Sequence, residues 1–161
     1  MSTLTVWKFD SPQGAQDALN KLIDLSKQHL IQVNDAAIVS WEAGKKKPKT
    51  HNYGSLTGQG ALSGAFWGML FGLLFFVPLF GMAVGAAMGA LSGKFADYGI
   101  NDKFIKEVRE QVTEGTSALF LMTSDAVQDR VAEAFQGVSV ELIQSNLTSE
   151  QEAQLTEDFG G

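Results

Sequence analysis

The sequence contains no cysteine and only two histidines in its 161 residues. Without cysteine, the chain can form no disulfide, no thiolate nucleophile and no zinc–thiolate site. The histidines, His29 and His51, do not match the spacing of metal ligands. No pair of carboxylates is marked out for acid–base catalysis, and Gly93-Lys94 is followed by Phe95 instead of the Ser or Thr of a phosphate-binding loop. We therefore predict a protein that is not an enzyme and that has no cofactor, metal ion or catalytic residue.

Charged side chains are absent from the middle of the chain, where no Lys, Arg, Asp or Glu lies between Lys49 and Lys94. Such a stretch is rare in a domain whose surface faces water. Over the whole chain, 18 acidic side chains outnumber 12 basic ones, which gives a net charge of −6. Because nucleic-acid binding needs cations that neutralise phosphates, we expect no nucleic-acid partner. The basic run at residues 45–49 is typical either of an anchor on a membrane surface or of a solvated loop.

Glycine at four-residue spacing fills much of the uncharged stretch. The two glycine ladders are Gly60, Gly64, Gly68 and Gly72, and then Gly81, Gly85, Gly89 and Gly93. Residues four apart lie on one face of a helix, and glycine there lets a second backbone approach closely. We therefore predict a glycine-zipper hairpin of two helices from about Ser55 to Ser92, with an apolar turn at Phe75–Phe80. We predict that all eight glycines serve helix packing and homo-oligomerisation. Each glycine costs a helix about 1 kcal/mol relative to alanine, and either this packing or a bilayer that forbids unpaired backbone groups must offset the cost.

Three environments for this hairpin are compatible with the sequence. In a bilayer, each arm would only just reach the hydrocarbon thickness, and the apolar turn favours a hairpin that dips in and returns. In water, hairpins from several copies would pack inside a soluble ring or shell. In the third environment, the hairpin is the buried core of a monomer. We disfavour it, because a domain of this size is too small to bury the whole hairpin from water. We favour a membrane-associated homo-oligomer with a structural or regulatory role; a small channel or carrier is a further alternative.

The segments on either side of the hairpin predict an α+β fold. Residues 1–43 predict strand–helix–strand, and residues 100–147 predict helix–strand–helix–strand. The predicted strands are Leu4–Phe9, Ala36–Trp41, Ala118–Met122 and Val138–Ile143, and the predicted helices run from Asp10-Ser11-Pro12 to about His29, from Asn101-Asp102 to Gly115 and from Ser124-Asp125 to Gly137. Together they predict a split ferredoxin-like plait, interrupted by a basic linker and the glycine-zipper hairpin at residues 44–99. Residues 148–161 form a C-terminal tail.

A four-stranded plait leaves one face of its sheet uncovered by its own helices. If Leu4 and Val6 face those helices, Trp7 and Phe9 face outward, because side chains alternate along a strand. Exposed aromatic side chains usually mark an interaction surface. We therefore expect the sheet face with Trp7 and Phe9 to contact another subunit or the hairpin.

Two short segments are similar to one protein family. They are Gly54-Ser55-Leu56-Thr57-Gly58-Gln59-Gly60, which leads into the first ladder, and residues 148–155 of the tail, Thr-Ser-Glu-Gln-Glu-Ala-Gln-Leu. With the glycine-rich hairpin between its two flanking halves, nearly the whole chain resembles the bacterial family of predicted membrane proteins called domain of unknown function 1269 (DUF1269). The resemblance implies a bacterial, membrane-associated protein, and we predict that it lies at the inner membrane. Basic residues on both flanks of the hairpin predict that the ferredoxin-like domain lies in the cytoplasm, with an entirely cytoplasmic protein as the alternative. The resemblance implies no substrate, cofactor or catalytic residue.

Overall fold

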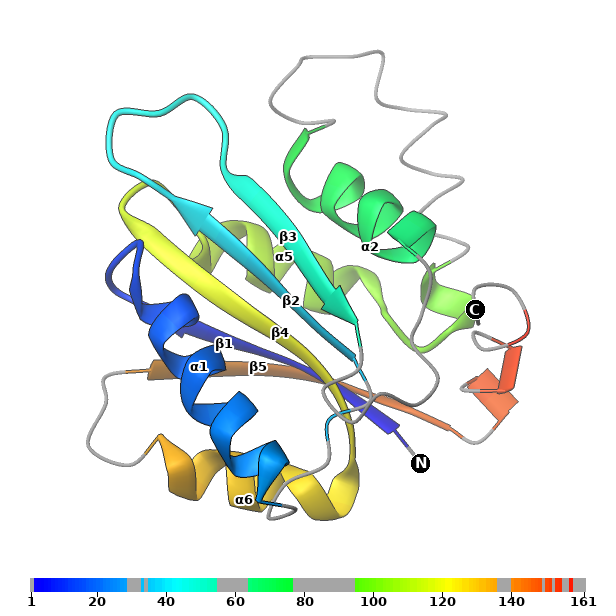
Figure 1. Cartoon of the computed structure of the whole chain (residues 1–161). Helices are drawn as coiled ribbons and strands as arrows, with labels where there is room; N and C mark the ends of the chain where they lie inside the picture. The colour runs from blue at the N-terminus through cyan, green and yellow to red at the C-terminus, as the bar shows by residue number, and fades with distance from the viewer. Residues whose placement is uncertain are drawn as a thin grey trace.

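The computed structural model describes residues 2–28, 33, 35–54, 64–76, 95–135, 140–148, 150, 151, 153, 154 and 157. These residues form an α+β protein (Figure 1). The strands are β1 (Ser2–Phe9), β2 (Asp35–Trp41), β3 (Lys49–Gly54), β4 (Thr116–Ser124) and β5 (Val140–Leu147). The helices are α1 (Gly14–Lys27), α2 (Gly64–Phe71), the π-helix η1 (Gly72–Phe76), α5 (Asp102–Gln111) and α6 (Asp125–Ala134).

The five strands form one antiparallel sheet in the order β3-β2-β4-β1-β5. In its centre, Phe120 of β4 lies opposite Val6 of β1 and Ala37 of β2. The side chains of Ala118–Met122 are all buried, which confirms the prediction of a central strand covered on both faces. The two halves of the chain interleave, because β4 lies between β1 and β2, and β1 lies between β4 and β5. Neither half can therefore form this sheet alone.

Helices α1 and α6 cover one face of the sheet (Figure 1). Trp7 and Phe9 point into this layer, where the ring of Phe135 lies 5.3 Å from that of Trp7 and 5.8 Å from that of Phe9. Trp7 and Phe9 each expose only 3% of their surface. The predicted outward orientation of these two aromatic residues is therefore wrong. Alternation separates two sets of side chains on β1, but both sets are apolar, so the pattern does not determine which set faces α1.

The opposite face of the sheet is covered by α2, η1 and α5 (Figure 1). Leu4 and Val6 belong to this face, together with Phe120. The ring of Phe120 lies 5.2 Å from that of Phe71 and 6.2 Å from that of Trp67, both in α2. The side chains that α5 contributes to this layer, with the residue that follows the helix, are Phe104, Ile105, Val108 and Val112. Residues 64–76, which belong to the predicted hairpin, thus cover part of the sheet face opposite α1 and α6.

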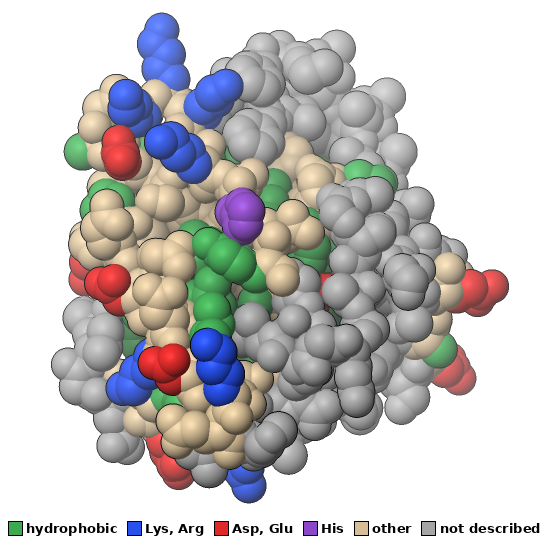
Figure 2. Space-filling view, viewed as in Figure 1, with side chains coloured by type: hydrophobic (Ala, Val, Ile, Leu, Met, Phe, Trp, Pro, Cys, Tyr) green, Lys and Arg blue, Asp and Glu red, His purple; other side chains and the backbone are tan. Residues whose placement is uncertain are grey.

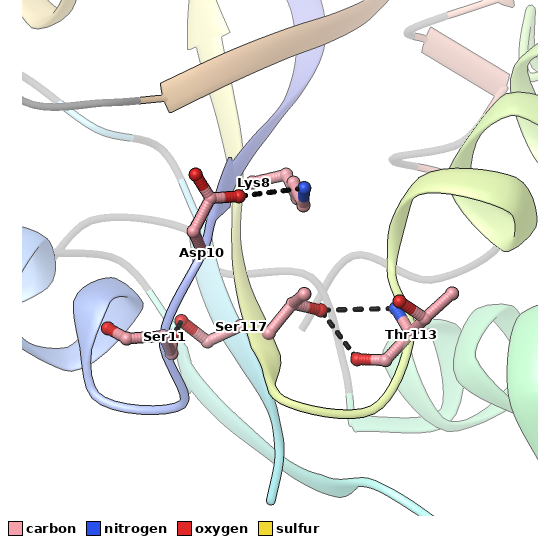
Figure 3. A network of polar contacts seen from close by, with 6 residues as sticks. Lys8, Asp10, Ser11, Thr113 and Ser117 are labelled. Carbon is pink, nitrogen blue, oxygen red and sulfur yellow. Dashed lines mark hydrogen bonds and ion pairs between the residues drawn. The ribbon is translucent and has the colours of Figure 1, made fainter. Parts of the chain in front are cut away.

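Local interactions begin α5 and shape the turn into β4. The side chain of Asn101 accepts a hydrogen bond of 2.9 Å from the backbone N–H of Phe104, which confirms the predicted cap. The hydroxyl of Thr116 donates to the carbonyl of Thr113 at 2.6 Å and accepts from its N–H at 3.1 Å (Figure 3). Gly115 adopts a φ of 80°, a left-handed conformation that glycine adopts without strain. The helix itself ends at Gln111, before the predicted end at Gly115.

A residue from a distant strand caps α1. This helix begins at Gly14, and the predicted start at Asp10-Ser11-Pro12 lies in the preceding turn. The hydroxyl oxygen of Ser117, on β4, accepts a hydrogen bond of 2.9 Å from the N–H of Ala15. The same hydroxyl donates to the carbonyl of Ser11 at 2.7 Å (Figure 3). The first turn of a helix has N–H groups without intrahelical partners, so Ser117 takes the place of a local cap. The start of α1 is therefore determined by tertiary structure.

The predicted basic linker is instead part of a β-hairpin. Strand β3 pairs with β2, with His51 opposite Ile38 and Thr50 opposite Val39. Its sequence, Lys49–Gly54, has no alternation of apolar residues, so it carries no strand signal of its own. Residues 42–48 form the loop of this hairpin, which we call the lysine loop.

Candidate functional site

The described part of the glycine-rich insert, residues 64–76, presents two different faces. Its bulky side chains are buried in the core against the sheet: Phe66, Trp67, Leu70, Phe71, Leu73, Leu74 and Phe75. Gly68 is exposed and Gly72 is half-buried. A Cβ atom added at Gly68 or Gly72 would meet no described atom within 4 Å. Gly68 therefore lies on the side of α2 that does not face the sheet.

The predicted packing glycines are only partly visible. Gly64 begins α2, Gly68 lies within it, and Gly72 begins η1. The other predicted members lie outside the described residues: Gly60, Gly81, Gly85, Gly89 and Gly93. Packing of a second helix on Gly68 therefore stays a prediction. Trp7 and Phe9, the predicted sheet-face contacts, are buried beneath α1 and α6 and lie on the other side of the sheet from this glycine face.

A buried carboxylate fastens α2 to the sheet. Asp35, at the start of β2, exposes only 1% of its surface. Its Oδ1 accepts a hydrogen bond of 3.1 Å from Nε1 of Trp67 and one of 3.0 Å from the N–H of Ala36. A buried carboxylate is costly unless it is hydrogen-bonded, and bonds to a charged acceptor are stronger than neutral ones. Asp35 and Trp67 therefore form a specific clasp between strand and insert.

This clasp is not predicted above, although two signals for it are present in the sequence. Asp35 directly precedes the apolar strand residues Ala36–Val39, and Trp67 is the only tryptophan in the uncharged stretch. A tryptophan N–H that is buried needs an acceptor. Nothing in the sequence indicates that these two residues meet, because their contact depends on how α2 is laid across β2.

The other end of this segment is held by Arg109 of α5. Nη2 of Arg109 donates a hydrogen bond to the carbonyl of Leu73, within η1. Burial lowers the pKa of Arg109 below its usual value, and Asp102 partly opposes this by raising it. An arginine stays protonated across the physiological range, so this donor is permanent. Nearby, the rings of Phe75 and Trp41 meet edge to face at 6.2 Å. Residues 64–76 thus run along β2, from Asp35 at its start to Trp41 at its end.

The described residues offer no cluster of side chains for a metal ion. No group of three or more His, Cys, Asp or Glu in the described ranges is arranged to hold a metal ion. His51 is exposed on β3, with its ring 4.4 Å from that of Tyr53. His29 lies outside the described residues. Within the same described ranges, no helix combines the length and the apolar character that crossing a bilayer requires.

The fold and the insert define the class of this protein: an α+β protein whose antiparallel sheet lies between two helical layers, one of them supplied by a glycine-rich insert. Residues 61–160 match the family described as Protein of unknown function (DUF1269), and the chain belongs to this family. The family resemblance is thereby confirmed. No curated protein and no solved structure matches the chain. The matched region contains β4 and β5 but not β1, which lies between them in the sheet.

Proposed function

We propose that this protein is a non-enzymatic, homo-oligomeric structural or regulatory protein whose copies pack through the glycine-rich insert. The orientation of α2 carries the proposal: its bulky side chains are engaged by the sheet of the same chain, while Gly68 is exposed. A helix that turns glycine outward offers its backbone for close approach by another helix. The second glycine ladder, Gly81 to Gly93, is the complementary surface in a neighbouring copy.

No contact among the described residues explains why positions 68 and 72 are glycine, and this supports a partner outside the described chain. An added Cβ at Gly68 or Gly72 would meet no described atom within 4 Å, so the described part of the chain does not require glycine at either position. Alanine would also favour the helix by about 1 kcal/mol at each position. Glycine at these positions therefore costs stability that packing inside the described chain does not return. Close contact with a second helix would return it.

The strand order supports a ferredoxin-like plait as the framework for this insert. The units β1–α1–β2 and β4–α6–β5 are interleaved, and each encloses one strand of the other. This is the arrangement of a split βαβ repeat. In the proposed architecture, β3, α2 and η1 belong to the insert between the two units, and α5 connects the insert to the second unit. Helices α2 and α5 cover the second face of the sheet.

The assembly proposal is tested by the mass of the purified protein, measured by light scattering. Leucine at Gly68 or at Gly85 would keep the helices apart by the size of its side chain, so we expect Gly68→Leu and Gly85→Leu to reduce the oligomer to smaller species. Ala132→Leu is a matched control, because Ala132 is exposed on α6 and gains the same type of side chain. An unchanged oligomer mass in both glycine variants would refute assembly through the glycine face.

A second candidate function, association with a membrane, is favoured by the absence of charge between Lys49 and Lys94. The described arm is not free to enter lipid. If it left the sheet, Leu4, Val6 and Phe120 would be uncovered, at about 1.5–3 kcal/mol for each side chain exposed to water. We therefore propose contact with the surface of the bacterial inner membrane from the cytoplasmic side, with residues 64–76 retained on the sheet.

Fractionation of expressing cells separates these possibilities. Surface association predicts protein in the membrane fraction that an alkaline carbonate wash releases. Retention after the wash would show insertion into lipid and would revive the small channel or carrier alternative. Protein found only in the soluble fraction, at a defined large mass, would reject membrane association and leave the ring or shell in the cytoplasm.

A further inference from the structure

The lysine loop concentrates positive charge at one end of an acidic protein. Lys45, Lys46 and Lys47 are exposed in the loop, and Lys49 is exposed at the start of β3. They line a cavity of about 490 Å³ together with Ser40, Glu42 and Pro48. None of the four ammonium groups is paired with a carboxylate in the part of the chain that the structure describes. Figure 2 shows basic side chains gathered at the end of the molecule where this loop lies in Figure 1.

The backbone of the lysine loop is held in place. The N–H of Lys45 donates to the carbonyl of Glu42 at 3.2 Å, across a turn in which Gly44 has a φ of 83°. Nε1 of Trp41 donates to the carbonyl of Lys45 at 2.9 Å. The N–H of Gly44 donates to Oε2 of Glu114 at 3.3 Å. A fixed backbone presents its lysines together and lowers the entropic cost of binding a partner.

The structure also brings the lysine loop beside the end of the apolar arm. Trp41 forms both contacts: its N–H bonds the loop, and its ring meets that of Phe75 in η1 at 6.2 Å. Phe75 is followed by Phe76, the last residue of η1 and of the described arm. The sequence suggests the opposite arrangement, with the basic run at the base of the hairpin and far from its turn. In the fold, β3 leads the chain away from the loop, and α2 and η1 bring it back.

We propose that the lysine loop is a docking surface for anionic phospholipid headgroups. Four unpaired ammonium groups on one loop match the phosphates of an acidic bilayer, and each lysine near such a surface contributes separately to binding. The uncharged stretch that follows Lys49 favours a bilayer over a nucleic acid, which would need positive charge spread over a larger face than this protein of net charge −6 offers. This inference deepens the proposed membrane association and does not depend on assembly through the glycine face.

The experiment is co-sedimentation of the full-length protein with vesicles of phosphatidylcholine alone, or mixed with phosphatidylglycerol. We expect binding to the mixed vesicles, and weaker binding as salt is raised and the charges are screened. A variant with Lys45→Gln, Lys46→Gln and Lys47→Gln should bind them roughly a hundredfold more weakly. A variant with arginine at the same three positions should bind like the wild type, because its charge is retained.

The matched control carries Lys27→Gln, Lys103→Gln and Lys106→Gln, three exposed lysines of α1 and α5, and has the same net charge as the loop variant. Equal binding by the two glutamine variants would refute the lysine loop as the contact while leaving membrane association in place. A wild type that binds neither vesicle would refute both. If vesicles are not bound but the loop variant and salt both lower the oligomer mass, the loop binds acidic residues of another copy, and the lipid inference is wrong.

Discussion

Replacement of Trp67 by phenylalanine tests whether the insert is fastened to the sheet. The substitution keeps an aromatic ring in the core and removes the N–H that bonds Oδ1 of Asp35 at 3.1 Å. If residues 64–76 lay in a bilayer instead, the indole would have no buried carboxylate to lose. The free energy of unfolding of Trp67→Phe therefore reports directly on where this arm lies.

The expected magnitude follows from the contact that is lost. A hydrogen bond to a charged acceptor contributes about 1.5–3 kcal/mol to stability. The smaller ring of phenylalanine also buries less apolar surface, which costs about 1 kcal/mol. We therefore expect Trp67→Phe to lower the free energy of unfolding by about 3 kcal/mol. Asp35→Asn keeps an acceptor oxygen but loses the charge, so it should cost less, about 1 kcal/mol.

Urea unfolding followed by far-UV circular dichroism measures both effects without relying on tryptophan fluorescence. Trp41→Phe is the matched control, because Nε1 of Trp41 donates to the neutral carbonyl of Lys45 at a half-buried position. Its cost should be at most about 1 kcal/mol. The double variant Trp67→Phe with Asp35→Asn should be less destabilised than the sum of the single variants, because the two residues interact. Equal costs for Trp67→Phe and Trp41→Phe would refute the clasp.

Two further predictions concern the framework. Gly14→Ala should lower the free energy of unfolding by about 1–3 kcal/mol, because the new Cβ would lie 2.5 Å from Cβ of Phe9; an unchanged thermal midpoint would contradict this close packing. A fragment of residues 61–161, which includes the family-matched region, should show no cooperative unfolding, because β1 is missing from between β4 and β5; a cooperatively folded fragment would contradict the strand order.

Much of the framework could be predicted where local chemistry determines structure. Asn101 caps α5 through its own side chain, and the apolar run Ala118–Met122 forms a central strand because both faces of β4 are covered. Features that depend on distant partners were missed. Strand β3 exists because it pairs with β2, and α1 begins at Gly14, where Ser117 of β4 supplies its cap.

The environment of the insert was harder to predict, because hydrophobicity does not show what covers its apolar side chains. Apolar residues such as Phe66, Leu70 and Leu74 are equally suited to lipid, to another subunit or to the sheet of their own chain. For the whole hairpin, the small size of the domain argues against the last environment, yet the described arm, residues 64–76, occupies it. The aromatic residues of β1 show the same limit: Trp7 and Leu4 are both apolar, and only the packed structure assigns each to a face.

The most direct test of assembly through the glycine face uses the absence of cysteine from the chain. In Gly68→Cys and Gly85→Cys variants, every thiol lies on one of the glycine ladders. Under mild oxidation, the account predicts disulfide-linked dimers for Gly68→Cys alone or in an equimolar mixture with Gly85→Cys, and none for Ala132→Cys on α6. No dimer from either glycine variant, or as much dimer from Ala132→Cys, would contradict the account.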